Sequence, residues 1–182
     1  MARLFIAIDF PQDVKEHIAN ACYGVSSARW VPMEQIHLTL RFIGETDNTT
    51  YNAVVDALDS VHGESFSLQL SGAGHFPPRG KPRVLWLGIK PQPLLISLQR
   101  NIEEALERAG VERERRKFSP HVTVARLRER TRGADIIPFL SVNGLFSAGP
   151  ISVTEFHLYS SILKPEGAIH RIEQTFSLAP EG

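Results

Sequence analysis

The sequence predicts an α+β protein with mainly antiparallel sheets, built as two similar halves. Short strand-like segments outnumber the helical ones, and most connections between them are short. The pattern His-x-Thr-x occurs twice, at residues 37 and 121, 84 residues apart. Each copy follows a helical segment and precedes further strands, so the chain is organised as a loose duplication of two lobes that face each other. Because no low-complexity linker divides it, we expect one two-lobed domain over residues 1–182.

The strands are predicted from short apolar or alternating runs that end at Pro, Gly or polar residues. Pro11 ends the first run, LFIAIDF, and Gly44 ends the run IHLTLRFI. A Gly- and Pro-rich loop over 72–82 separates an alternating strand from the run VLWLGI. In chain order, strands are expected at 4–10, 36–43, 66–70, 84–89, 121–127, 145–148, 153–160 and 169–178.

Three segments between these strands have apolar residues at helical spacing. A short helix is expected over 12–23, and a stripe of Ala, Val and Leu predicts a second helix over 49–61. The strongest pattern spans 94–109, where Gly110 supplies the stop signal. The polar segment 128–135 is expected to be irregular.

The composition sets only broad limits on the class of protein. Twenty Lys and Arg balance twenty Asp and Glu, so the formal net charge is zero. Cys22 is the only cysteine, which excludes an intrachain disulfide and favours a cytoplasmic location. Asp9 interrupts the first apolar run, so we expect a strand there, with no signal peptide and no membrane span in the chain. No sustained heptad suggests an obligate partner, so a monomer is expected.

Positive charge is concentrated between residues 108 and 132, around the second His-x-Thr-x copy. This segment contains nine Lys or Arg residues against three Glu. A solvated loop and helix end would explain such a run. A local basic field that attracts a phosphorylated ligand would explain it as well. The charge pattern alone leaves both interpretations open.

The two His-x-Thr-x copies each place an imidazole and a hydroxyl on one face of a predicted strand. Side chains alternate along a strand, so His37 shares a face with Thr39, and His121 shares a face with Thr123. The apolar residues between them face the core. A single copy would more often be a hydrogen-bonded bystander, but two matched copies indicate a catalytic pair.

Two imidazoles and two hydroxyls suit the cleavage of a phosphodiester. One neutral histidine acts as general base toward water, and the other, protonated, acts as general acid toward the departing sugar oxygen. The threonine hydroxyls donate to phosphate oxygens, where negative charge is concentrated. A strained cyclic phosphate with an oriented leaving group has less need of a metal. Neither copy has metal-site spacing and a two-ligand zinc site is a poor alternative, so we expect no metal and no cofactor.

Arginines and aromatic residues near the two copies are further candidates for substrate binding. Arg41 has the strand parity of His37 and is expected to point into the same space, although a strand-end arginine is more often solvated. Arg126 has the opposite parity to His121, so it reaches the phosphate only if the strand bends or ends near Ala125. Four rings are candidates for base stacking, with core packing the favoured role for each: Phe10, Phe42, Phe76 and Trp86.

With these segments in view, the chain resembles the two-histidine (2H) phosphoesterase superfamily. Within it, the chain is similar to the bacterial RNA 2′,3′-cyclic phosphodiesterases, also called 2′-5′ RNA ligase-like proteins. The resemblance covers nearly the whole chain, and the doubled motif is its most specific part. It rests on RLFIAIDFP (3–11), HLTLRFIGE (37–45), GAGHFPP (72–78), RVLWLGI (83–89), FSPHVTVAR (118–126) and TEFHLYSS (154–161).

The resemblance implies a bilobal fold in which the two histidine strands face each other across a central cleft. By the same resemblance, His37 is the proton donor to the leaving oxygen and His121 is the base that activates water. Thr39 and Thr123 hold the phosphate, and a binding role for Arg126 is favoured. The implied substrate is an RNA or oligonucleotide end with a 2′,3′-cyclic phosphate, and the implied product is a 2′-phosphate. Some family members also bind nucleotides.

The C-terminal part departs from the family pattern. The family usually has a tyrosine three residues after a glycine, whereas here Gly167 is followed by Ala, Ile and His170. The ring of His170 is a partial substitute, so substrate preference is less determined than reaction type. Two alternatives to hydrolysis are reversible 2′-5′ RNA ligation by the same histidines, and nucleotide or RNA binding without turnover. Retention of both histidines and both threonines argues against binding alone, and the abundance of water favours hydrolysis over ligation.

Overall fold

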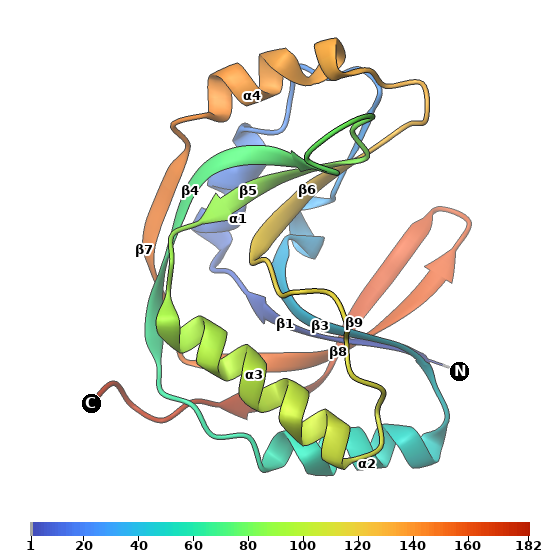
Figure 1. Ribbon diagram of the computed structural model, residues 1–182, viewed down its shortest axis with the longest axis vertical. Coiled ribbons are helices and arrows are strands. Elements are labelled where there is room, and N and C mark those ends of the chain that lie inside the picture. Colours follow the sequence, from blue (N-terminus) through green and yellow to red (C-terminus); the bar gives the residue numbers. More distant parts are fainter. Residues whose placement is uncertain (1) are drawn as a thin grey trace.

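The computed structural model describes residues 2–182 and confirms the α+β class, with two antiparallel sheets (Figure 1). The strands are β1 (Ala2–Asp9), β2 (Ala28–Trp30), β3 (His37–Thr46), β4 (Phe66–Phe76), β5 (Val84–Ile89), β6 (His121–Leu127), β7 (Ser147–Val153), β8 (Glu155–Lys164) and β9 (Gly167–Ser177). The α-helices are α1 (Gln12–Asn20), α2 (Asn48–Asp59), α3 (Pro93–Arg108) and α4 (Ile137–Asn143), with 3-10 turns η1 (Met33–Gln35) and η2 (Gly133–Ile136).

The strand order of the first sheet is repeated in the second. The first sheet has the order β3-β1-β8-β9, and the second has the order β2-β6-β5-β4-β7. In both sheets three further strands follow the histidine strand in order on one side. The run β3-β1-β8-β9 therefore corresponds to the run β6-β5-β4-β7. In the described chain, β2 is the one strand without a counterpart. The duplication predicted from the doubled motif is therefore present in the topology.

The core is formed by alternating strand residues and by the apolar faces of the helices. On β1, for example, Leu4, Ile6 and Ile8 are buried, as the alternation of LFIAIDF requires. Helices α2 and α3 pack against the first sheet and α4 packs against the second, at opposite ends of the molecule (Figure 1). One cluster of buried apolar side chains includes residues of both sheets.

Strand β4 continues through the segment that was expected to be a Gly- and Pro-rich loop. It pairs with β5 up to Phe76, with Gly74 directly opposite Trp86. A Cβ added to Gly74 would lie 2.3 Å from Cζ2 of the Trp86 ring, so the glycine makes room for the indole. The glycines of this segment therefore mark a close approach within a sheet, and the prediction of a loop from residue 72 was wrong.

Further elements differ from the sequence prediction, and among them strand β2 was not expected. Strand β3 passes Gly44, which adopts a φ of +93° at a register shift, and continues to Thr46. Helix α4 follows the polar segment and was not predicted; it starts at Ile137, with Pro138 in its first turn, where a missing N–H has no cost. It shifts the next strand from the expected 145–148 to Ser147–Val153.

Candidate active site

The two histidine strands contain the same irregularity at the same distance from the histidine. On β3, Ala7 of β1 lies opposite Thr39, but Ile6 lies opposite Arg41. Leu40 is therefore an extra residue, and the strand is bulged there. Beyond the bulge the alternation of faces is reversed, so that Leu40 and Arg41 are both buried.

Strand β6 repeats this arrangement against β5. Trp86 lies opposite Thr123, but Leu85 lies opposite Ala125, so Val124 is the extra residue. Val124 and Ala125 are both buried, and the pattern of burial along the seven residues of β6 matches the first seven of β3. Each motif thus ends in a bulge that turns its fifth following residue toward the face that carries the histidine.

The bulges decide which arginine faces the substrate space. The prediction that Arg41 points into the cleft was wrong: its side chain is 7% exposed and its Nε lies 2.8 Å from Oε2 of Glu103 on α3. It also donates to the carbonyls of Phe42 and Glu112. The bulge supplies the bend that Arg126 needed, and Arg126 lines the cavity. Phe42 is its counterpart on β3; it is 56% exposed and also lines the cavity, so core packing was the wrong role for it.

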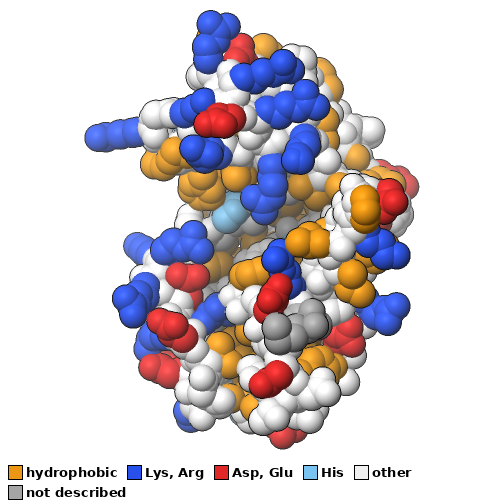
Figure 2. Space-filling model, turned by 90° about the vertical axis from the view of Figure 1, so that its right-hand side faces the viewer, with side chains coloured by type: hydrophobic (Ala, Val, Ile, Leu, Met, Phe, Trp, Pro, Cys, Tyr) orange, Lys and Arg blue, Asp and Glu red, His pale blue; other side chains and the backbone are white. Residues whose placement is uncertain are grey.

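A cavity of about 460 Å³ lies between the two histidine strands. Figure 2 shows the hollow, with a histidine ring in its wall and Lys and Arg side chains gathered above it. The volume suits a ligand the size of a nucleotide. The cavity is lined by Arg3, Phe5, Val31, Gln35, His37, Thr39, Phe42, His121, Thr123, Arg126, Ser161, Leu163, Ala168 and His170. The structure thus brings together both motif histidines and both motif threonines.

Backbone carbonyls orient both motif histidines in the same way. Nδ1 of His37 lies 2.6 Å from the Gln35 carbonyl oxygen, and Nδ1 of His121 lies 2.7 Å from that of Ser119. A carbonyl oxygen only accepts, so each Nδ1 carries the hydrogen and donates it. Nε2 is then the nitrogen that gains or loses a proton. For His37, Nε2 lies 3.0 Å from Oγ1 of Thr39.

Aromatic side chains pack against both imidazoles and restrict their rotation. Phe5 stacks on His37 with ring centroids 5.0 Å apart. Phe76 meets His121 edge-on at 4.9 Å, and Trp86 lies at 6.5 Å. Phe76 and Trp86 therefore support a motif histidine. Among the other candidates for stacking, Phe10 is 4% exposed, in agreement with the core role favoured for it.

Burial lowers the pKa of both motif histidines. For His37 burial lowers the pKa to about 4; the hydrogen bond to Gln35 opposes the shift, and His170 adds to it whenever His170 is itself protonated. For His121 burial also lowers the pKa, and the hydrogen bond to Ser119 opposes the shift. Both imidazoles are therefore uncharged in the free protein at neutral pH. A phosphate anion between them would favour the protonated form of either.

His170 is a third imidazole at the cavity, with the opposite hydrogen-bonding arrangement. Its ring lies edge-on to His37 at 5.7 Å and to Phe5 at 4.9 Å. Its Nδ1 is buried and has no hydrogen-bond partner in the described chain, so the tautomer with hydrogen on Nε2 is favoured. Burial lowers the pKa of His170. It therefore presents a neutral Nε2–H donor.

Gln35 and Phe5 are site residues that sequence reasoning missed. The side-chain amide of Gln35 donates to the Ala168 carbonyl of β9 at 2.5 Å, while its own carbonyl holds His37. It thereby links the β8–β9 hairpin to the first histidine. No sequence signal marks a backbone acceptor of this kind. Phe5 could not be distinguished because β1 is apolar on both faces.

Within residues 2–182 no three His, Cys, Asp or Glu side chains are grouped so that they could hold a metal ion. Over the same residues, no helix is both long enough and apolar enough to cross a membrane.

The chain matches a known family over most of its length. The sequence model of the 2′-5′ RNA ligase superfamily matches residues 5–163. A protein of Archaeoglobus fulgidus named RNA 2′,3′-cyclic phosphodiesterase is 34% identical over 178 residues, which cover 96% of this chain and 99% of that protein. A protein of Thermotoga maritima with the same name is 32% identical over 177 residues, covering 93% and 92%.

Solved structures show the same fold. The crystal structure of Escherichia coli LigT complexed with 3′-AMP superposes with a TM-score of 0.78 at 28% identity, covering 97% of this chain and 98% of that one. A crystal structure described as a phosphoesterase gives a TM-score of 0.81 at 27% identity and covers 98% of each chain. The two-lobed arrangement is thus a property of the chain's relatives as well.

Proposed function

The chain belongs to the 2′-5′ RNA ligase superfamily, and we propose that it hydrolyses 2′,3′-cyclic phosphates at RNA 3′ ends without a metal. The observation that carries this proposal is the pair of matched, bulged strands, each presenting a carbonyl-oriented histidine to one cavity. The reaction that we propose is the one for which the relatives are named. The two Nε2 atoms, whose orientation the carbonyls fix, supply the acid and the base that hydrolysis of a phosphodiester needs.

We assign the base to His121 and the acid to His37. Nε2 of His121 takes a proton from water, and the water oxygen forms a bond to phosphorus. The bond from phosphorus to the 3′ oxygen breaks, and this oxygen receives the proton that Nε2 of His37 carried. The products are a 2′-phosphate and a free 3′ hydroxyl. Exchange of protons with solvent then restores both imidazoles.

The two threonines and Arg126 stabilise the charge that develops on the phosphate. Thr39 and Thr123 lie on the cavity face beside their histidines, so each hydroxyl can donate to a non-bridging oxygen. Arg126 adds a guanidinium to the same space. Removing one such donor typically costs about 100- to 1,000-fold in rate. The exposed ring of Phe42, on the other histidine strand, gives the nucleobase of the substrate a surface on which to stack.

The test is turnover of 2′,3′-cyclic AMP and of a short RNA with a cyclic phosphate end, in excess EDTA. His37→Ala and His121→Ala should each lose at least about 100-fold in kcat. Activity that needs an added metal, or that survives either substitution, would contradict the proposal. Binding of RNA by the wild-type protein without any turnover would favour a binding module. Product analysis by chromatography against 2′- and 3′-nucleotide standards would identify the leaving oxygen.

A second candidate, reversible 2′-5′ ligation, follows from the description of the family. Microscopic reversibility lets the same histidines join a 2′,3′-cyclic phosphate end to a 5′ hydroxyl. Water at its ordinary concentration should make hydrolysis faster. If ligation of two RNA fragments outpaced hydrolysis of the same cyclic end, this order would be wrong.

We propose that the active protein is a cytoplasmic monomer. Both motif histidines and both motif threonines line the cavity of a single chain, so the proposed chemistry needs no residue from a second copy. The single cysteine supports a reducing location. Light scattering after size-exclusion chromatography tests the oligomeric state, and a catalytically active dimer would contradict it.

A further inference from the structure

Strand β2 breaks the internal repeat of the two sheets and brings an arginine beside Arg126. It pairs with β6 at the edge of the second sheet, and no strand of the first sheet corresponds to it. In this pairing Arg29 lies directly opposite Arg126. The pairing continues past the end of β6, because the backbone N–H of Arg128 donates to the Ser27 carbonyl at 3.1 Å. We call Arg29, Arg126 and Arg128 the arginine row.

The register places Arg29 and Arg126 on the cleft side of the sheet, and Arg128, two residues after Arg126, continues the row past the end of β6. Residues directly opposite each other in a ladder point to the same face, so Arg29 shares the face on which Arg126 lines the cavity. The next pair, Trp30 and Ala125, points the other way, and Trp30 packs on Phe139 of α4. The row therefore leads from the cavity toward the outside along β6. Arg29 and Arg128 do not line the cavity themselves.

The charges of the row are exposed and unpaired. All three arginines are exposed, and in the described chain no carboxylate forms an ion pair with any of them. Like charges directly opposite each other destabilise a ladder, so the Arg29–Arg126 pair has a cost that a bound anion would offset. Other arginines of the basic stretch are neutralised locally, in the pairs Arg113–Glu107, Arg115–Glu112 and Arg116–Glu114.

We propose that the arginine row binds the backbone phosphates of nucleotides that precede the RNA 3′ end, so that the protein prefers oligonucleotides over cyclic mononucleotides. This inference rests on the proposed function. The cavity has room for about one nucleotide, so the rest of an RNA chain must leave it. The row offers this part of the RNA a line of positive charges, which bind backbone phosphates. Figure 2 shows that Lys and Arg side chains gather along the upper border of the hollow.

The experiment compares 2′,3′-cyclic AMP with a short RNA of about five nucleotides that ends in a cyclic phosphate. In Arg29→Gln and Arg128→Gln, KM for the RNA should rise about 3- to 10-fold each, with kcat unchanged. Both parameters for cyclic AMP should stay within about twofold, because it has no preceding phosphate. The slope of log(kcat/KM) against log[salt] for RNA should fall by about 0.7 for each arginine removed.

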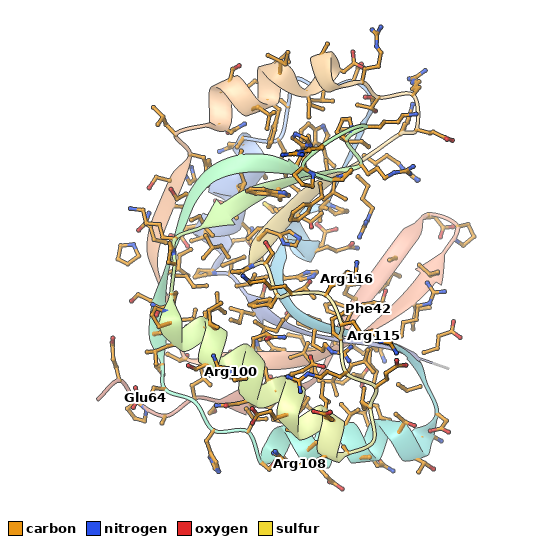
Figure 3. The ribbon with its side chains drawn as sticks, viewed as in Figure 1. Phe42, Glu64, Arg100, Arg108, Arg115 and Arg116 are labelled. Atoms are coloured by element: carbon orange, nitrogen blue, oxygen red, sulfur yellow. The ribbon has the colours of Figure 1, made fainter. Side chains whose placement is uncertain are left out.

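Arg108→Gln is the matched control. Arg108 is an exposed arginine at the far end of α3, well separated from Phe42 at the cavity (Figure 3). It should change neither substrate's KM nor the salt slope. An unchanged KM for RNA in Arg29→Gln, or an equal loss with both substrates, would overturn the inference. If wild-type protein turned over neither substrate, the proposed function would fail instead; fluorescence anisotropy with the same RNA would then test the row, and equal binding by wild type and Arg29→Gln would overturn it.

Discussion

The pH dependence of turnover tests the proposed division of labour between the two histidines. The productive form has His37 protonated and His121 neutral. Burial lowers the pKa of His37 to about 4, so only about one molecule in a thousand has this group protonated at pH 7. The pKa of His121 is also lowered from 6.5. Because both pKa values are lowered, the profile of kcat/KM should be a bell with its maximum below pH 6.5, and kcat/KM should fall as the pH rises to 7.

The assay is the hydrolysis of 2′,3′-cyclic AMP in EDTA, at constant ionic strength, between pH 4 and 8.5. kcat/KM reports the free enzyme, and kcat reports the complex with substrate. The bound phosphate anion favours charged imidazoles, so the bell for kcat should lie at higher pH than that for kcat/KM. Circular dichroism over the same range is the control for acid unfolding. A maximum of kcat/KM at or above pH 7 would refute the argument from burial.

A bell alone does not say which histidine is the acid, because coupled acid and base groups exchange roles without changing its shape. The residual activity of His37→Gln distinguishes them. If His121 is the base, this activity requires neutral His121 and should rise with pH to a plateau. A residual activity that falls with rising pH would mean that His121 is the acid, and the assignment of roles would be reversed.

Three more outcomes follow from individual contacts. Gly74→Ala should lower kcat at least about tenfold and destabilise the fold by about 1–3 kcal/mol, because its Cβ would displace Trp86 from the second motif histidine; kinetics and thermal unfolding measure both. Glu103→Gln should reduce the free energy of unfolding by about 3–5 kcal/mol, since it leaves Arg41 buried without its partner, while kcat of the folded protein is kept; urea unfolding measures the loss. His170→Phe should raise KM for cyclic AMP about 2- to 10-fold, because the ring stays but the Nε2–H donor is lost.

Each of these changes has a control in the chain. Gly133→Ala adds a Cβ where no heavy atom lies within 4 Å, so it should leave kcat unchanged. A loss of kcat in Gly74→Ala alone would then be due to the clash with Trp86 and not to the change from Gly to Ala. Replacing both members of the buried ion pair, as Arg41→Met with Glu103→Leu, should recover part of the stability lost by Glu103→Gln. His170→Tyr restores a donor and should recover KM relative to His170→Phe. A loss of kcat in Glu103→Gln at low temperature would contradict the structural role of the pair.

Local patterns in the sequence were enough to predict most of the fold. Periodicity located the three longer helices, and the single run VLWLGI matched β5 at both ends. The two strand ends that were placed too early, in β3 and β4, share one physical cause: glycine was interpreted as a break. Gly44 and the glycines of β4 lie inside strands, because a bulge or a neighbouring ring there requires a residue without Cβ. The need for such a residue arises from a partner strand that is distant in sequence.

The candidate site was predictable where strand parity holds, and unpredictable beyond the first irregularity. His37 and Thr39 lie before the bulge on β3, and parity places them correctly in the cavity. Arg41 lies just past it, and parity fails. A β-bulge depends on how two strands pair, so one strand's sequence does not specify it. The backbone carbonyls that accept hydrogen bonds from the two histidines also cannot be predicted from the sequence, because every residue type has a carbonyl.

The repeated bulge also explains how one duplicated strand produces two unlike cavity walls. Both strands turn the fifth residue after the histidine into the cavity and bury the fourth. Sequence divergence at these positions then has separate consequences: Phe42 against Arg126 changes what the walls bind, while Arg41 against Ala125 changes how the strand is anchored. At the position of Phe42 and Arg126 the first wall has an aromatic ring and the second has a guanidinium. The substrate that we propose has a base and a phosphate, which this asymmetry suits, and strand β2 extends the cationic side by placing Arg29 beside Arg126.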